Sequence, residues 1–123
     1  MVKQITKGGG PKELPIQRVV RRFQEKPGED TPESMEKLRK GVLRHYDPNA
    51  PTGVVRAVDD ALLAVIGRHD DISAAPTERE LDEGHDMYRK ALAIANHLID
   101  KSPLNETRQR AIGWRGKNTR LAF

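Results

Sequence analysis

The stretch TERELDEGHDMYRKALAIANHLIDKSP, residues 77–103, decides the fold class of this chain. Thr77 and Glu80 have the spacing of a capping box, in which the threonine caps a helical amide and the glutamate reaches back to the threonine amide. Apolar side chains then recur at helical spacing over about five turns: Leu81, Tyr88, Leu92, Ala95 and Ile99, with Ala91 and Leu98 widening the same face. The stretch therefore predicts one long amphipathic helix, which the Ser-Pro pair at 102–103 ends.

Three more helices are predicted on the N-terminal side of this stretch. Residues 13–26 carry apolar side chains at helical spacing and precede a Pro-Gly pair. Thr31 followed by Pro32 has the pattern of an N-cap and a first helical residue, and a proline-rich turn at 47–51 ends this second helix. Residues 52–67 are apolar on more than one side, so we expect the third helix to be the most buried.

A short fifth helix is predicted over residues 103–112, with Ser102 as its cap and Pro103 at its first position. Gly113 and Gly116 are expected to break the helical backbone after that. The predicted fold is therefore all-α, a small antiparallel bundle of four main helices plus a short C-terminal helix.

Extended N- and C-terminal arms are expected on either side of this single domain. Residues 1–12 hold three lysines and a Gly-Gly-Gly-Pro sequence, which is typical of a flexible basic leader. We assign residues 13–112 to the helical bundle and residues 113–123 to a basic extended tail.

Charge is sorted along the chain. Residues 1–46 hold 11 Lys and Arg against 6 Asp and Glu, residues 47–102 hold 6 against 11, and residues 103–123 hold 5 against 1. An acidic middle therefore lies between two basic ends, although the formal net charge is only +4. Such asymmetry indicates that the ends and the middle meet different surroundings.

The composition argues against several classes of protein. There is no cysteine, which excludes a disulfide scaffold, a thiolate zinc site and a cysteine nucleophile. No apolar run approaches the roughly 18 residues of a membrane span, and the first residues lack the apolar segment of a secretory signal. We therefore expect no membrane partner, no cofactor or metal, and a location in the cytoplasm or in a particle assembled there.

The acidic middle offers one candidate for catalysis. Glu80 and Glu83 lie three residues apart and share a helical face, and the preceding helix carries Asp59 and Asp60. Carboxylates on facing helices can hold Mg²⁺, but the known helical hydrolases of this kind need paired motifs on two neighbouring helices. Because the helix dipole alone favours carboxylates at a helix start, a Mg²⁺-dependent helical hydrolase is an alternative, and we predict no enzymatic activity.

The basic ends are the favoured contact surface. Arginine and lysine bind phosphates, and an aromatic ring gives a nucleic-acid base a surface to stack on. The same ends suit a protein partner, with Trp114 and Phe123 as apolar anchors and the arginines paired with acidic neighbours. The predicted contact residues are Arg18, Arg21, Arg22, Arg39, Lys40, Arg44, Arg108, Arg110, Trp114, Arg115, Lys117, Arg120 and Phe123.

We therefore expect a non-enzymatic binding and assembly protein, a small helical subunit of a larger assembly of phage or nucleoprotein type. Its partners would be other protein subunits, a nucleic-acid backbone or further copies of itself, and a purely solvated basic surface is the plain alternative. A non-sequence-specific nucleic-acid-binding protein is the second hypothesis. Sequence-specific reading of DNA is not expected, because the two prolines at 47–51 do not suit the tight turn of a helix-turn-helix motif.

Overall fold

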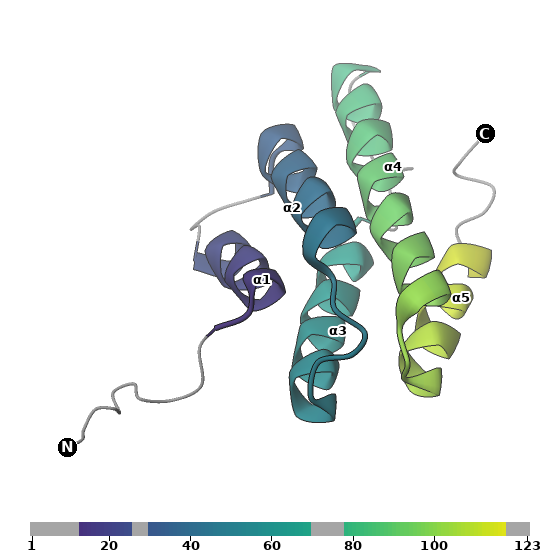
Figure 1. Ribbon diagram of the computed structural model, residues 1–123. Coiled ribbons are helices and arrows are strands. Elements are labelled where there is room, and N and C mark those ends of the chain that lie inside the picture. Colours follow the sequence, from purple (N-terminus) through teal and green to yellow (C-terminus); the bar gives the residue numbers. More distant parts are fainter. Residues whose placement is uncertain (1–12, 26–29, 70–77, 118–123) are drawn as a thin grey trace.

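Every regular element of the described chain is an α-helix. The computed structural model describes residues 13–25, 30–69 and 78–117, and side chains of the last range from 85 onward. Over these residues the helices are α1 (Pro15–Glu25), α2 (Pro32–His45), α3 (Thr52–Gly67), α4 (Glu78–Lys101) and α5 (Asn105–Lys117), as Figure 1 shows. The predicted all-α fold is confirmed. The capping box expected at Thr77 and Glu80 and the arm expected at 1–12 lie outside the described residues. Of the extended tail expected at 113–123, residues 113–117 are helical instead, and the rest lies outside the described residues.

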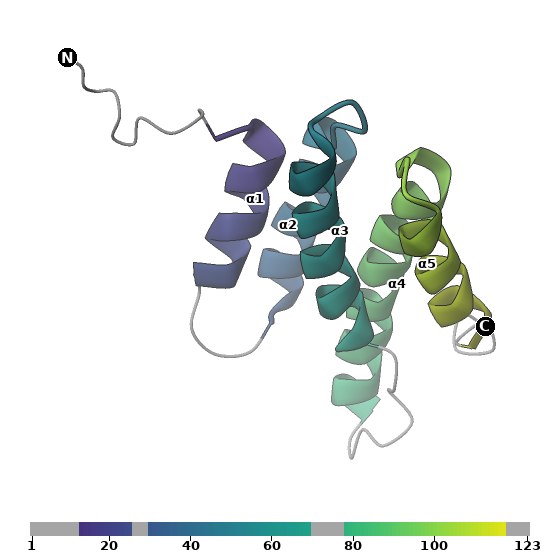
Figure 2. The ribbon, with the colours of Figure 1, turned by 90° about the horizontal axis from the view of Figure 1, so that it is seen from below.

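Four of the helices form the sides of the bundle. α1 packs on α2 and on α3, and α4 packs on the same two helices, so that α2 and α3 stand at opposite corners. α5 packs against α3 and α4. Figures 1 and 2 show from two directions that α1 lies at one edge of the bundle and α5 at the other. The N-terminal and C-terminal basic regions of the described chain are therefore held on different sides of the molecule.

The core lies inside this ring, and α3 contributes to it from several sides, as expected. Its buried apolar residues are Val55, Val58, Leu62, Leu63, Val65 and Ile66. The face predicted for α4 is confirmed at Tyr88, Ala91, Ala95 and Leu98, which are buried. It left out the fully buried Ile94, and Leu92 and Ile99 are only half-buried. The run from 91 to 95 is apolar at every position, so periodicity alone does not identify its inward side.

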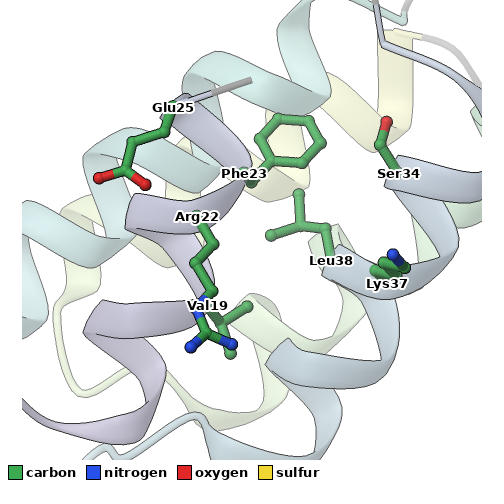
Figure 3. Close-up of a pocket in the computed structure, with 7 residues that line it drawn as sticks. All are labelled: Val19, Arg22, Phe23, Glu25, Ser34, Lys37 and Leu38. Atoms are coloured by element: carbon green, nitrogen blue, oxygen red, sulfur yellow. The ribbon is translucent and has the colours of Figure 1, made fainter.

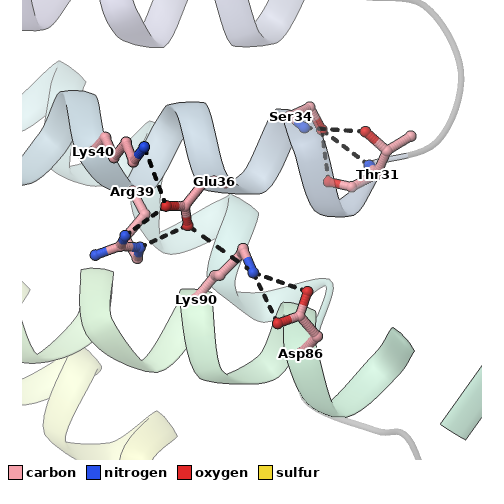
Figure 4. Close-up of polar contacts among 7 residues, drawn as sticks. All are labelled: Thr31, Ser34, Glu36, Arg39, Lys40, Asp86 and Lys90. Carbon is pink, nitrogen blue, oxygen red and sulfur yellow. Dashed lines mark hydrogen bonds and ion pairs between the residues drawn. The ribbon is translucent and has the colours of Figure 1, made fainter. Parts of the chain in front are cut away.

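The start of α2 follows the predicted cap. The Thr31 hydroxyl accepts a hydrogen bond of 3.0 Å from the Ser34 amide, and the Ser34 hydroxyl accepts one of 2.9 Å from the Thr31 amide (Figure 4). Serine thus takes the reciprocal position of the capping box that Glu or Gln usually holds. Pro32 at the first helical position completes the predicted pattern.

The limits of α5 differ from the prediction at both ends. The helix begins at Asn105 rather than at 103 and continues to Lys117, so the expected break at 113 is wrong. Ser102 accepts a hydrogen bond of 3.1 Å from the Leu104 amide but lies before the helix. Helical backbone continues past Gly113 because Ala111 is fully buried and Trp114 packs against the core, and this tertiary packing outweighs the low helix propensity of glycine.

Candidate functional site

The basic residues predicted as contacts fall into two groups in the structure. In the first group, the charge of the residue is balanced by an acidic side chain of the same molecule. Arg21 donates to Glu13 at 2.7 Å and to Glu25 at 2.9 Å, and Arg18 lies 3.7 Å from Glu13. The hydrogen bond from Arg21 lowers the pKa of Glu13. These charges of α1 are therefore already balanced by carboxylates of the same chain.

Arg39 and Lys40 of α2 belong to the same neutralised group. Arg39 donates two hydrogen bonds to Glu36, of 2.9 and 2.6 Å, which lower the pKa of that carboxyl. Lys40 lies 3.7 Å from the same carboxylate, and Lys90 of α4 connects Asp86 to it (Figure 4). This network joins α2 to α4 and is structural in character.

The basic residues of α5 also make internal contacts. Arg108 donates to the Ser102 carbonyl at 2.7 Å, Arg110 lies 3.4 Å from Asp60, and Arg115 donates to Asn96 at 2.9 Å. Lys117 is exposed at the end of the helix. Arg120 and Phe123, predicted as contacts in the tail, lie outside the described residues.

Trp114 faces the bundle and not the solvent. Its ring centroid lies 5.4 Å from that of Tyr88, at an interplanar angle of 32°, and Tyr88 is only 1 % exposed. Such a tilted pair stabilises the packing of α5 on α4. The structure therefore uses this aromatic ring, expected as a stacking platform for a base or as an anchor for a partner, to hold α5 in place.

Arg22 and Arg44, two exposed cations of α1 and α2, form the second group, and the exposed Lys37 of α2, which was not among the predicted contacts, resembles them. Arg22, Lys37 and Arg44 make no ion pair or hydrogen bond through their side chains with any described residue. Lys37 and Arg44 are seven residues apart, two turns along one side of α2, and Arg22 of α1 lines the same pocket as Lys37 (Figure 3). We call Arg22, Lys37 and Arg44 the basic face.

A hollow of about 560 Å³ lies beside the basic face, between α1 and α2 (Figure 3). Its apolar surface comes from Val19, Phe23 and Leu38, and Arg22 and Lys37 stand on its two walls. The hydrogen bond with Arg21 neutralises the remaining acidic lining residue, Glu25. The hollow therefore combines an apolar floor with an uncompensated positive charge.

Local packing creates this hollow and fixes its floor. Gly41 lets α2 approach α1 closely, because a Cβ atom there would stand 2.6 Å from Cγ1 of Val19. Leu38, a larger residue about one turn before Gly41 on α2, lines the hollow. Phe23 is held by Arg68, whose guanidinium lies 5.9 Å from the ring centroid and forms hydrogen bonds of 3.1 and 3.2 Å with Asp30. The aromatic side of the floor is thus preorganised.

A separate polar cluster is buried in the bundle around Asp59 of α3. Asp59 is 0 % exposed and accepts hydrogen bonds of 2.7 Å from the Tyr46 hydroxyl and 2.7 Å from the Ser102 hydroxyl. Burial raises the pKa of Tyr46, and the neighbouring Asp59 raises it further. Both hydroxyls therefore remain hydrogen-bond donors to Asp59. Through these bonds the cluster connects Tyr46 at the end of α2 and Ser102 in the turn before α5 to the middle of α3.

The alternative metal site finds no support in these positions. Asp59 is occupied by the two hydroxyls, and Asp60 is exposed beside Arg110. The side chains of Glu80 and Glu83 lie outside the described residues. Among the side chains that the structure describes, no three His, Asp or Glu groups lie together as ligands of a metal ion.

His97 gives the bundle a pH dependence. Burial lowers the pKa of His97, which packs edge-on against the Tyr46 ring at 5.5 Å, and Lys101 lowers it further. Around and below pH 6.5, the ordinary value, His97 therefore binds protons more weakly in the folded chain than in the unfolded chain. We expect the free energy of unfolding to fall as the pH drops below this value, by at most about 1.4 kcal/mol per pH unit.

The measurement is urea unfolding between about pH 7.5 and 5, a range that covers the ordinary pKa of histidine. His97→Gln should reduce the slope of stability against pH. Equal slopes for the variant and the wild type would assign the dependence to other groups. Protonation of Asp30 should also reduce stability, but at a lower pH than protonation of His97. Burial opposes ionisation of this carboxyl, but the bonds from Arg68 and His69 outweigh it and lower its pKa.

Comparisons with protein-family models, with curated proteins and with solved structures gave no match for this chain. None of the described helices is both long and apolar enough to cross a membrane. The basic face and the hollow beside it therefore form the candidate functional site. The predicted contact residues include Arg22 and Arg44 but leave out Lys37 and the apolar floor, because periodicity assigns Phe23 and Leu38 to the core.

Proposed function

We propose that this chain is a non-enzymatic binding subunit that joins a larger assembly through the basic face, where it meets an acidic surface of a protein partner. The observation that carries the proposal is that the side chains of Arg22, Lys37 and Arg44 make no ion pair or hydrogen bond with any residue that the structure describes. Five other predicted contact residues are instead paired with carboxylates of the chain: Arg18, Arg21, Arg39, Lys40 and Arg110. Unpaired cations beside an apolar hollow have the composition of a protein interface, in which an apolar centre is flanked by charged residues.

A nucleic-acid backbone is the second candidate for this face. The three cations of the basic face favour it, because phosphate contacts need only Lys and Arg in reach of one another. Two observations favour the protein partner instead. Phosphates make no use of an apolar floor, and Trp114, the expected stacking ring, packs on Tyr88.

The function is tested with fluorescently labelled poly-L-glutamate as a probe for an acidic protein surface. We expect the wild type to bind it at about 50 mM salt and more weakly at about 150 mM, because screening weakens exposed charge contacts. Lys37→Glu/Arg44→Glu should lower the affinity at least about tenfold, a change of roughly 1.4 kcal/mol. Anisotropy titrations measure the effect.

The matched control is Arg89→Glu/Lys101→Glu, which changes the net charge equally at two exposed positions of α4 that are away from the basic face. An equal loss of affinity in both variants would mean that only net charge matters, and the basic face would then not be the contact. If the wild type binds neither poly-L-glutamate nor DNA, the basic face is a solvated surface and the proposal is wrong. Binding of DNA alone, with a log–log salt slope of several units, would establish the nucleic-acid alternative.

A further inference from the structure

We propose that the hollow between α1 and α2 seats the apolar side of an acidic amphipathic helix from a partner protein, whose carboxylates bind Arg22 and Lys37. The inference rests on the proposed function and goes further, because it names the occupant and the two kinds of contact. Its first support is size. A space of about 560 Å³ lies within the roughly 300–1,000 Å³ range of sites that enclose organic ligands, so apolar side chains of a docked helix fit.

The second support is the chemistry of the floor. Phe23 and Leu38 belong to the core and, at 9 % and 2 % exposed, leave only a small area open to the hollow, and Val19 is half-buried there. Covering these surfaces removes apolar area from water, which contributes about 25 cal/mol per Å². An occupant that carries charge alone would leave this contribution unused.

The third support is charge complementarity across the hollow. Arg22 stands on the wall from α1 and Lys37 on the wall from α2 (Figure 3). The other polar lining groups are already bonded, Glu25 to Arg21 and the Ser34 hydroxyl to the Thr31 amide and carbonyl. Among the described residues that line the hollow, Arg22 and Lys37 are therefore the polar groups without a described partner, and both are complementary to an anion.

An amphipathic helix supplies both properties from one regular element. Residues three and four apart lie on one face of a helix, so apolar side chains can point into the hollow while glutamates on either side of them reach the two walls. Docking of an apolar helix face into a groove is an established mode of peptide recognition. The chemistry of the hollow thus fits an acidic helix better than an extended nucleic-acid strand.

The test uses a fluorescein-labelled synthetic helix of about 16 residues, with leucines at the i, i+3, i+4 and i+7 spacing of one face and glutamates beside them. A scrambled peptide of identical composition keeps the charge and loses the apolar face. We expect the wild type to bind the amphipathic peptide at least tenfold more tightly than the scrambled one at about 150 mM salt. The methyl signals of Val19 and Leu38 should shift during an NMR titration with the amphipathic peptide.

Arg22→Glu/Lys37→Glu should weaken binding of the amphipathic peptide at least tenfold, whereas Arg89→Glu/Lys101→Glu should change it less than twofold. The melting curve of each variant verifies that it is folded. Equal affinity for the two peptides, or unchanged Val19 and Leu38 signals, overturns the docked helix while leaving the proposed function intact if poly-L-glutamate still binds. Dimerisation of the wild type in sedimentation equilibrium, abolished by Arg22→Glu/Lys37→Glu, also overturns it, because the occupant would then be a second copy.

Discussion

Replacing Asp59 by alanine is expected to lower the free energy of unfolding by about 3 kcal/mol or more. The substitution leaves the hydroxyls of the buried Ser102 and the half-buried Tyr46 without the carboxylate that accepts from them, and each unsatisfied buried group costs about 1–3 kcal/mol. Asp59→Asn should cost much less, because its amide keeps one acceptor oxygen and offers a donor to either hydroxyl. Chemical denaturation of the two variants and the wild type measures the difference.

A double-mutant cycle between Asp59→Ala and Tyr46→Phe separates the hydrogen bond from other effects of each change. We expect a clear coupling energy, since the two side chains are in direct contact. Additive losses would show that the bond contributes nothing to stability. If Asp59→Ala and Asp59→Asn are equally harmful, the loss follows from charge or volume rather than from the acceptor oxygens.

The second large effect is expected at Gly41. A Cβ there would stand 2.6 and 2.8 Å from the two methyl carbons of Val19, and such overpacking typically costs 1–3 kcal/mol. Alanine would also gain about 1 kcal/mol of helix propensity over glycine. We therefore expect Gly41→Ala to destabilise the bundle by up to about 2 kcal/mol, and thermal or urea unfolding measures this.

Two variants make the Gly41 prediction specific. Gly113→Ala is the matched control, because a Cβ at this helical glycine meets no atom within 4 Å, and it should stabilise the chain by up to about 1 kcal/mol. Val19→Ala removes the obstructing methyl groups, so Gly41→Ala should become favourable in that background. Destabilisation of similar size with and without Val19 would mean that close helix contact is not the cause.

The helices were predictable because their caps and breaks are local. Thr31-Pro32 marks the start of α2, and the expected range 52–67 agrees with α3 at both ends. The inward side of α4 was predictable except at Ile94, since the run 91–95 is apolar throughout and only the neighbouring helices decide which of its residues are buried. The extent of α5 depends on the contact between Trp114 and Tyr88, which lie on different helices.

The candidate site was predictable only in part. Sequence shows which residues are basic, but pairing decides which of them remain available. Arg21 and Arg22 are adjacent in the chain, yet Arg21 binds two carboxylates and Arg22 faces the hollow. No periodicity distinguishes the two, because the acidic partner Glu13 lies eight residues away from Arg21.

The buried carboxylate of α3 also determines how that helix can be seated in the bundle. A helix that is apolar on several faces can pack against its neighbours in more than one axial position, because hydrophobic contact is non-directional. A shift of α3 by one turn, about 5.4 Å, would carry Asp59 away from both hydroxyls and leave it stranded among apolar groups. The two hydrogen bonds to Asp59 thus favour one axial position of α3 over the others. Directional polar contacts fix the position of a helix whose apolar contacts alone would not.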